Sequence, residues 1–203
     1  MKSQFSRSPF LLMIGMAASS VSAQALTYSF EGTAHQWSSV EEISKLEVVK
    51  AGEGVPPEAV TDGEDALKIS HAKTGGGFVP LMRINHQDRN WWNALKHPQN
   101  TRVRVDVFVP AEATKGIATN WAVIGLALQG GGYQAIRTQQ DLKPGRDNKM
   151  AIELDLTPVK EALKTAPWSQ LTLFINTGDG TATRSPVYVD NFRILPAESD
   201  SNP

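Results

Sequence analysis

The segment TRVRVDVFV, residues 101–109, decides the fold class because two kinds of side chain alternate along it. Valine occupies every odd position from 103 to 109, while Arg104, Asp106 and Phe108 occupy even ones. Successive side chains of a β-strand point to opposite faces, so this period of two predicts a strand with one buried and one open face. A strand of an antiparallel sheet that packs on a second layer has those two environments.

The same alternation recurs on both sides of this segment, between clusters of turn-forming residues such as Asp62-Gly63 and Lys143-Pro144-Gly145. Eight short strands without regularly interleaved helices predict an all-β fold, a sandwich of two antiparallel sheets of the jelly-roll kind. The seven further strands are expected at 66–70, 78–84, 121–129, 133–138, 150–156, 170–176 and 187–195.

One or two short helices are expected as connectors. Thr157 is suited to cap a helix, Pro158 suits its first position, and Pro167 prevents it from continuing beyond 159–164. Residues 39–45 are the second candidate, because Ser39 and a glutamate three residues later have capping-box spacing.

The two ends of the chain are expected to lie outside the domain. Residues 1–23 combine early basic residues, a short apolar run and small residues before Ala23, the pattern of a cleaved secretory signal. The remainder suits one β-jelly-roll domain at 24–195, followed by a disordered polar tail at 196–203. The sequence therefore predicts a secreted or periplasmic protein.

Composition excludes several classes of function. Twenty basic and twenty-one acidic residues give a net charge of −1, so neither nucleic acid nor an anionic membrane surface meets a positive field. Cysteine is absent, which excludes disulfides and thiolate metal sites. We expect a monomer with no nucleic-acid partner and no membrane insertion once the signal is removed.

Three stretches together resemble the galactose-binding-like jelly-roll family of carbohydrate-binding modules, which includes cellulose- and xylan-binding members. They are the opening strand at 28–32 followed by Trp37, the glycine-then-strand step at 62–69 and the closing strand at 187–194. Their order spans nearly the whole chain beyond Ala23. The resemblance implies a secreted, non-catalytic protein that recognises a polysaccharide or oligosaccharide in an aromatic and polar cleft on one sheet.

The resemblance also implies a structural calcium ion. In that family, calcium often joins the first and last strands through an acidic residue after the opening phenylalanine and the aspartate of the closing strand. Glu31 and Asp190 are the matching residues. Calcium prefers six to eight oxygen ligands, which two carboxylates, carbonyls and water can supply. The alternative is that Glu31 is a solvated strand-end residue and Asp190 accepts hydrogen bonds from a turn.

Sugars are bound by aromatic rings that stack on their C–H faces and by planar polar side chains that pair with their hydroxyls. Such residues are needed on strand faces turned away from the core. Arg104 and Asp106 meet this requirement on their strand. Trp121 and Gln129 share a surface with Arg104 and Asp106 only if the strand at 121–129 pairs in the same sheet as the strand at 101–109.

Tyr133 and Arg137 on the following expected strand, and Asn176 at the end of a later one, belong to the same candidate set. Trp91 and Trp92 join it because they lie in a polar, turn-like segment where no periodic pattern places an apolar ring in a core. We expect at least one of these two tryptophans to face a ligand or the rim of the cleft.

Two alternatives remain. Sandwiches of this kind also host polysaccharide lyases and glycoside hydrolases, but Glu153 and Asp155 lack the second glutamate of the laminarinase-like enzymes, because Thr157 and Pro158 stand in its place. They are better interpreted as the solvated face of a strand. No residue is assigned a catalytic role. The other alternative is a surface or assembly module that binds protein on the same sheet.

Overall fold

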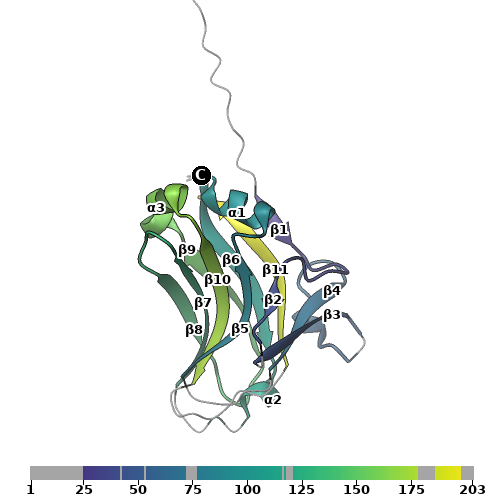
Figure 1. Cartoon of the computed structure of the whole chain (residues 1–203). Helices are drawn as coiled ribbons and strands as arrows, with labels where there is room; N and C mark the ends of the chain where they lie inside the picture. The colour runs from purple at the N-terminus through teal and green to yellow at the C-terminus, as the bar shows by residue number, and fades with distance from the viewer. Residues whose placement is uncertain are drawn as a thin grey trace, which may run out of the picture.

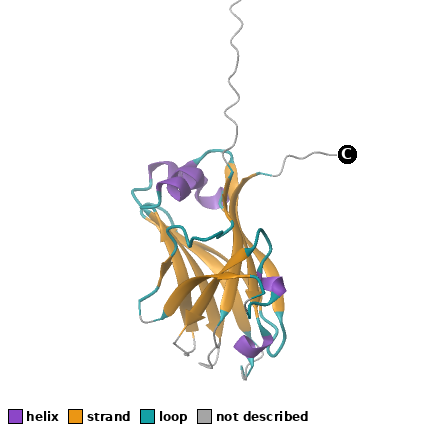
Figure 2. Ribbon diagram, turned by 90° about the vertical axis from the view of Figure 1, so that its right-hand side faces the viewer, coloured by secondary structure: helices purple, strands orange, loops and turns teal. Residues whose placement is uncertain are grey.

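Two antiparallel sheets stack face to face, with short helices at the ends (Figure 1, Figure 2). The computed structural model describes residues 25–41, 43–52, 54–71, 77–115, 117, 121–177 and 186–197. The predicted all-β sandwich is confirmed. The expected secretory signal at 1–23 and residues 198–203 of the expected tail lie outside the described residues.

Sheet A holds both end strands of the described chain. Its order is β3-β4-β11-β6-β9, with β1 paired to β11, so the first and last strands lie side by side. Its strands are β1 (Leu26–Tyr28), β3 (Ser44–Lys50), β4 (Asp65–His71), β6 (Asn100–Val109), β9 (Asn148–Asp155) and β11 (Val187–Pro196).

Sheet B has the order β2-β5-β10-β7-β8. The chain crosses between the sheets after β6, so β6 and β7 are consecutive in sequence but lie in different layers. The strands of sheet B are β2 (Ser38–Ser39), β5 (Gly77–Asn85), β7 (Ala122–Gly130), β8 (Ile136–Asp141) and β10 (Ser169–Thr177).

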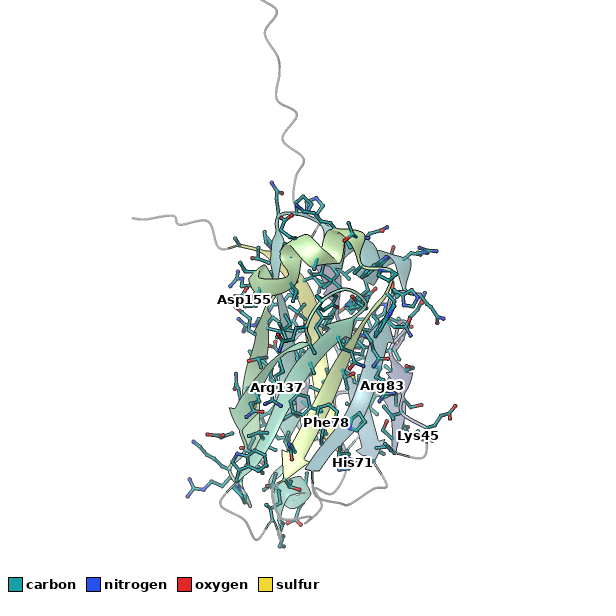
Figure 3. All side chains as sticks on the ribbon, turned by 60° about the vertical axis from the view of Figure 1, so that its left-hand side comes forward. Lys45, His71, Phe78, Arg83, Arg137 and Asp155 are labelled. Carbon is teal, nitrogen blue, oxygen red and sulfur yellow. The ribbon has the colours of Figure 1, made fainter. Side chains whose placement is uncertain are left out.

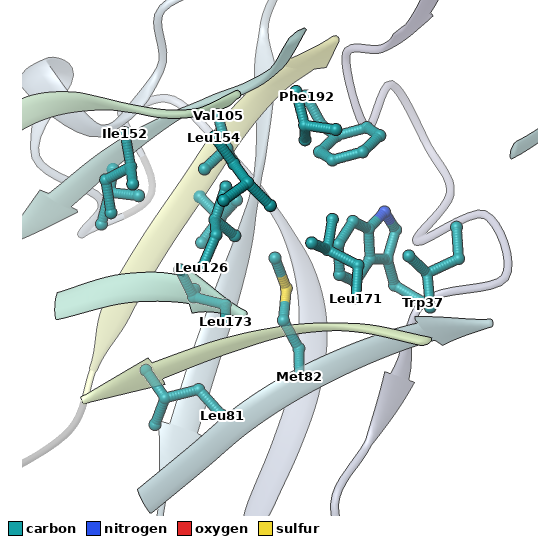
Figure 4. Close-up of a cluster of buried hydrophobic side chains, with 14 of the residues drawn as sticks. Trp37, Leu81, Met82, Val105, Leu126, Ile152, Leu154, Leu171, Leu173 and Phe192 are labelled. Carbon is teal, nitrogen blue, oxygen red and sulfur yellow. The ribbon is translucent and has the colours of Figure 1, made fainter. Parts of the chain in front are cut away.

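The core lies between the two sheets and follows the predicted alternation. All four odd-numbered valines of β6 are buried, and they meet the even-numbered residues of β7, among them Leu126. Figure 4 shows Leu126 and Leu173 from sheet B among Val105 and Leu154 from sheet A. Trp37 closes one side of this core, with its ring 5.0 Å from that of Phe192 in an edge-on arrangement.

Most of the helices lie at the ends of the sandwich, whereas the 3₁₀ turn η1 (Pro57–Ala59) packs on the outer face of sheet A against Phe108 and Tyr188. The other helices are α1 (Arg89–Lys96), α2 (Ala111–Thr114), η2 (Thr157–Val159) and α3 (Lys160–Thr165). The helix expected near Thr157 is confirmed as η2 and α3, but the expected cap is wrong: Thr157 is the first residue of η2, and neither helix has a side-chain cap at its N-cap residue. The helix considered at 39–45 is wrong: this segment contains the last residue of β2 and the start of β3, and Ser44 Oγ accepts a hydrogen bond from Val40 N in the turn between them.

Two predicted boundaries also change. The strand expected from Tyr133 begins at Ile136, because residues 131–133 form the turn after β7. At the other end, Pro196 still pairs with Asn100 as the last residue of β11, and Ala197 N donates to Gln99 O. The ordered sandwich therefore continues two residues into the expected tail.

Candidate functional site

The predicted ligand residues do not form one surface. Arg104 and Asp106 lie on the outer face of sheet A, whereas Trp121, Gln129 and Arg137 belong to the β7 and β8 side of sheet B. Trp121 and Gln129 were expected to share a surface with Arg104 only if β6 and β7 paired. That condition fails because these strands lie in different sheets.

The tryptophan pair in α1 is buried, so the expectation of an exposed turn is wrong. Asp88 caps a true helix by accepting a hydrogen bond from Trp91 N at 3.0 Å. The helix places Trp91, Trp92 and Leu95 on one face, in the core cluster. Trp91 is fully buried and Trp92 is 8% exposed, which removes both from the candidate ligand surface.

Tyr133 holds the turn between β7 and β8. Its hydroxyl lies 2.6 Å from Ser169 Oγ. Burial raises the pKa of Tyr133, and the hydrogen bond with Ser169 offsets only part of that rise. Gly130 has no room for a Cβ, because the Tyr133 ring and Trp168 O occupy that space. Tyr133 is therefore an anchor at the edge of sheet B, with its polar atom already engaged.

The outward side chains of sheet B, which we call the sheet B face, form four cross-strand rows. Each row runs from β5 through β10 and β7, and the first three reach β8. The rows are Phe78, Asn176, Val123 and Asp141; Pro80, Phe174, Gly125 and Gln139; Arg83, Thr172, Ala127 and Arg137; and Asn85, Gln170 and Gln129.

An aromatic pair lies on this face. The Phe78 ring is stacked on the Phe174 ring, with centroids 4.5 Å apart and an interplanar angle of 28°. Phe174 is 1% exposed, whereas Phe78 is 51% exposed. Gly125 makes room for the lower ring, because a Cβ there would approach Phe174 Cζ to 2.8 Å and collide with Thr138 O. The result is an open aromatic ring on a firm base.

Polar side chains lie near the aromatic pair, and most of them have no partner in the part of the chain that the structure describes; Gln170 and Thr172 are the exception, since they bond to each other. Within the described ranges, the side chains of Arg137, Gln139, Gln129 and Asn176 make no hydrogen bond or ion pair. Figure 3 shows Arg137 and Arg83 on opposite sides of this face, with Phe78 lower on the same face. An open ring beside planar polar groups suits a ligand with both C–H faces and hydroxyls.

Sheet A has a hollow of about 460 Å³ on its outer face, beside Arg104, Asp106 and Lys149. Asp106 is engaged internally, whereas within the described residues Lys149 makes no hydrogen bond or ion pair and Arg104 Nε makes no hydrogen bond. Asp106 Oδ2 accepts hydrogen bonds from Thr61 Oγ1 at 3.1 Å and from Asn191 Nδ2 at 3.0 Å, and Oδ1 lies 3.6 Å from Arg104 Nε. The residues that line this hollow include no aromatic ring on which a sugar could stack, so it is the weaker candidate for a carbohydrate site.

Asp190 and Glu31, the expected calcium ligands, accept hydrogen bonds from backbone N–H groups of residues 61–65, just before and at the start of β4. Asp190 is 1% exposed, and its Oδ2 accepts from Thr61 N, Thr61 Oγ1 and Asp62 N. Burial raises the pKa of Asp190, and the hydrogen bonds from Thr61, Asp62 and Asn191 oppose that shift.

Glu31 Oε1 accepts from Glu64 N at 3.0 Å and Asp65 N at 3.1 Å. Gly63 passes so close that a Cβ there would collide with the Glu31 carboxylate, which explains the glycine before β4. The hydrogen bonds to the two carboxylates use Glu31 Oε1 and chiefly Asp190 Oδ2, and they leave acceptor sites on Glu31 Oε2 and Asp190 Oδ1, because a carboxylate has about four such sites. Among the described residues, no three His, Asp or Glu side chains form a metal-binding group. Calcium stays a prediction from the resemblance.

Glu153 and Asp155 lie on the open face of β9, as expected from the alternation. Both are exposed. Glu153 Oε1 lies 3.3 Å from Arg102 Nη1, and Asp155 Oδ1 accepts a hydrogen bond from Thr157 N. Their interpretation as a solvated strand face is consistent with these contacts.

Comparisons with known proteins show the fold. No protein-family model matches the chain, and no curated protein matches it by sequence. An exo-β-agarase structure superposes with a TM-score of 0.51 at 10% identity, over 89% of this chain and 26% of the agarase. This chain thus spans about a quarter of that protein.

Two further similar structures are described as carbohydrate-binding. A carbohydrate-binding module of the β-sandwich superfamily has a TM-score of 0.49 at 15% identity, covering 81% of this chain and 59% of its own. A xylan-binding domain from Paenibacillus barcinonensis has a TM-score of 0.48 at 14% identity, covering 86% and 94%. In the described part of this chain, no helix has the length and apolar character needed to span a membrane.

Proposed function

We propose that this protein is a secreted, non-catalytic carbohydrate-binding protein whose ligand lies on the sheet B face. The Phe78 ring carries this proposal: it is half exposed, it is stacked on the buried Phe174 ring, and within the described residues the side chains of Asn176, Gln139 and Arg137 near it have no hydrogen-bond partner. An exposed aromatic ring of this kind is the usual platform for a sugar ring, and its burial by ligand stabilises the complex.

The roles of the side chains follow from the rows. Phe78 stacks on one sugar ring, and Asn176 beside it in the same row pairs with sugar hydroxyls. Gln139 lies in the next row and Gln129 at the far end of the face, so both reach neighbouring sugars of a chain. Short residues on β7, Gly125 and Ala127, keep the middle of the face low, which suits a ligand laid across the strands.

Several observations support export and binding without catalysis. The predicted signal at 1–23 supports export, and the resemblance to carbohydrate-binding modules supports polysaccharide or oligosaccharide binding. Part of the exo-β-agarase structure has the same β-sandwich fold, and agar is a polysaccharide, so this similarity also supports a polysaccharide ligand. On the sheet B rows the described acid is Asp141 alone, while a glycoside hydrolase mechanism requires a carboxylate pair.

Affinity electrophoresis in native gels tests the proposal. Each gel contains one polysaccharide from a panel of cellulose derivatives, xylans, galactans, agarose, alginate and polygalacturonate. We expect the wild type to be retarded by at least one polymer and Phe78→Ala to run as in an empty gel. Arg104→Gln and Lys149→Gln, on the outer face of sheet A, serve as controls and should be retarded like the wild type.

Three results would contradict the proposal. Retardation by none of the polymers would remove carbohydrate as the ligand. Loss of retardation in Arg104→Gln but not in Phe78→Ala would move the site to the hollow on sheet A. Release of reducing or unsaturated sugar ends during incubation would make the protein an enzyme.

A further inference from the structure

Two arginines of the sheet B face lie in one straight row. Arg83 of β5 pairs with Thr172 of β10, Thr172 pairs with Ala127 of β7, and Ala127 pairs with Arg137 of β8. Neighbouring strands are about 4.8 Å apart, so three steps separate the two arginine backbones by about 14 Å. Phe78 lies on the same strand as Arg83, two rows away, and Figure 3 shows it below both arginines on this face.

The residues between the two arginines are short. Thr172 is buried, and its Oγ1 accepts a hydrogen bond from Gln170 Nε2 at 3.3 Å, while Ala127 carries only a methyl group. Neither rises far above the sheet. No long side chain therefore stands in the row between the two arginines, and neighbouring side chains cover Thr172, which is 4% exposed.

The two arginines lack acidic partners. Within the described residues neither forms an ion pair, and Arg83 Nε is buried without a hydrogen-bond partner. Two arginines of sheet A, Arg102 and Arg104, do lie close to carboxylate oxygens of their own sheet, at 3.3 and 3.6 Å, whereas Arg193 on β11 also forms no ion pair within the described residues.

The local charge of the face is also positive. The described acid in its four rows is Asp141, two rows away from Arg137 on the same strand. The row that holds Arg83 and Arg137 and the rows on either side of it contain no described carboxylate. The face is thus cationic in a chain whose net charge is −1.

We infer that the glycan bound on the sheet B face is an acidic polysaccharide, whose uronate carboxylates pair with Arg83 and Arg137 while a sugar ring stacks on Phe78. This inference rests on the proposed function. A guanidinium presents parallel N–H donors that match a carboxylate in a bidentate pair, and such charge-assisted hydrogen bonds are stronger than neutral ones. A neutral glycan leaves both guanidinium groups without a counter-charge.

Isothermal titration calorimetry with matched polymers tests this inference. Polygalacturonate, alginate and glucuronoxylan are each compared with their carboxyl-reduced forms, which keep the backbone and lose the charge. We expect the wild type to bind at least one acidic polymer about tenfold or more tightly than its reduced form, since a charge-assisted hydrogen bond is lost. High salt should weaken the acidic interaction and leave the reduced form unaffected.

Variants locate the effect. Arg83→Gln and Arg137→Gln should each weaken binding of the acidic polymer about tenfold and leave the reduced form unchanged. Lys149→Gln removes one positive charge from the opposite side of the sandwich and should change neither. Thermal unfolding of all four proteins checks that the variants fold.

The outcomes separate the two proposals. Equal or tighter binding of reduced or neutral polymers, or unchanged binding in both arginine variants, overturns the acidic preference and leaves carbohydrate binding intact. An equal loss in Lys149→Gln also overturns it, because the effect is then one of total charge. Absence of binding to every acidic and neutral polymer overturns both.

Discussion

Asp190 Oδ2 accepts a hydrogen bond from Thr61 N at 2.6 Å, which joins the last strand of the sandwich to the segment that leads into β4. The two residues are 129 positions apart in sequence. Asp62 N donates to the same oxygen, and Asn191 N donates to Oδ1. All these partners are donors, so the position requires a group that accepts on both of its oxygens.

Asp190→Asn is predicted to destabilise the protein. An amide has one accepting oxygen, so its NH₂ group must face either the Thr61 side or Asn191 N, and buried donors lose their partner. We expect the free energy of unfolding in urea to fall by about 1–3 kcal/mol. Asp141→Asn, on an exposed carboxylate, is the control and should change it by less than about 0.5 kcal/mol. Equal stability of Asp190→Asn and wild type would refute this role for the carboxylate.

Chelation is predicted to leave the stability unchanged. Glu31 and Asp190 satisfy N–H donors at 61–65, so their role in holding this segment needs no cation. We expect the same Tm after dialysis against EDTA and after addition of calcium chloride. A Tm that rises by several degrees with calcium, and does so less in Glu31→Gln, would show instead that an ion joins the two ends of the chain.

The stability is predicted to rise with pH between about 8 and 10.5 because of Lys160. Its Nζ donates to Leu95 O at 2.8 Å, and the side chain is buried. Burial, and secondarily the charge of Lys164, lowers the pKa of Lys160 to about 8 from its ordinary value of 10.5. Between these values the unfolded state binds more protons, so the free energy of unfolding increases as pH rises.

Lys160→Met should remove this part of the pH dependence, as measured by urea unfolding at several pH values. Lys149→Met, at an exposed position, should retain it. An unaltered slope in Lys160→Met would mean that this amine keeps an ordinary pKa in the folded protein.

Tryptophans in α1 and before β7 are predicted to differ sharply in their effect on stability. Trp91→Ala removes a fully buried ring and should lower the free energy of unfolding by about 3–5 kcal/mol. Trp121 is 44% exposed, so Trp121→Ala should lower it by about 1 kcal/mol or less. Similar losses for both, measured by urea unfolding, would contradict the burial assigned to α1.

Alternation in the sequence predicts most strands because the side-chain period of a strand is a local property. The four valines of β6 and the leucines of β7 and β10 lie in the core as expected. Strands of only two or three residues are too short to show a recognisable alternation. β2 has two residues, and Ser39 and the glutamate after it imitate a capping box in a segment that turns into β3.

Pairing between distant strands is what the sequence could not predict. Phe78 appears in its strand as one alternating residue, and its base Phe174 is 96 positions away. Likewise, nothing local places β6 and β7 in different sheets, which separates Arg104 from Trp121. For α1 a local signal does exist: Asp88 as a cap, followed by buried residues at 91, 92 and 95.

The most direct test of the proposed site is an amide ¹H–¹⁵N NMR titration of the protein with an oligosaccharide from the polymer that retards it. Shifts are predicted for amides of β5, β7, β8 and β10 around Phe78, and their loss is predicted in Phe78→Ala. Amides around Asp106 and Ala151 on sheet A should stay in place. Shifts confined to sheet A, or shifts on sheet B that persist in Phe78→Ala, would contradict the binding face proposed for this protein.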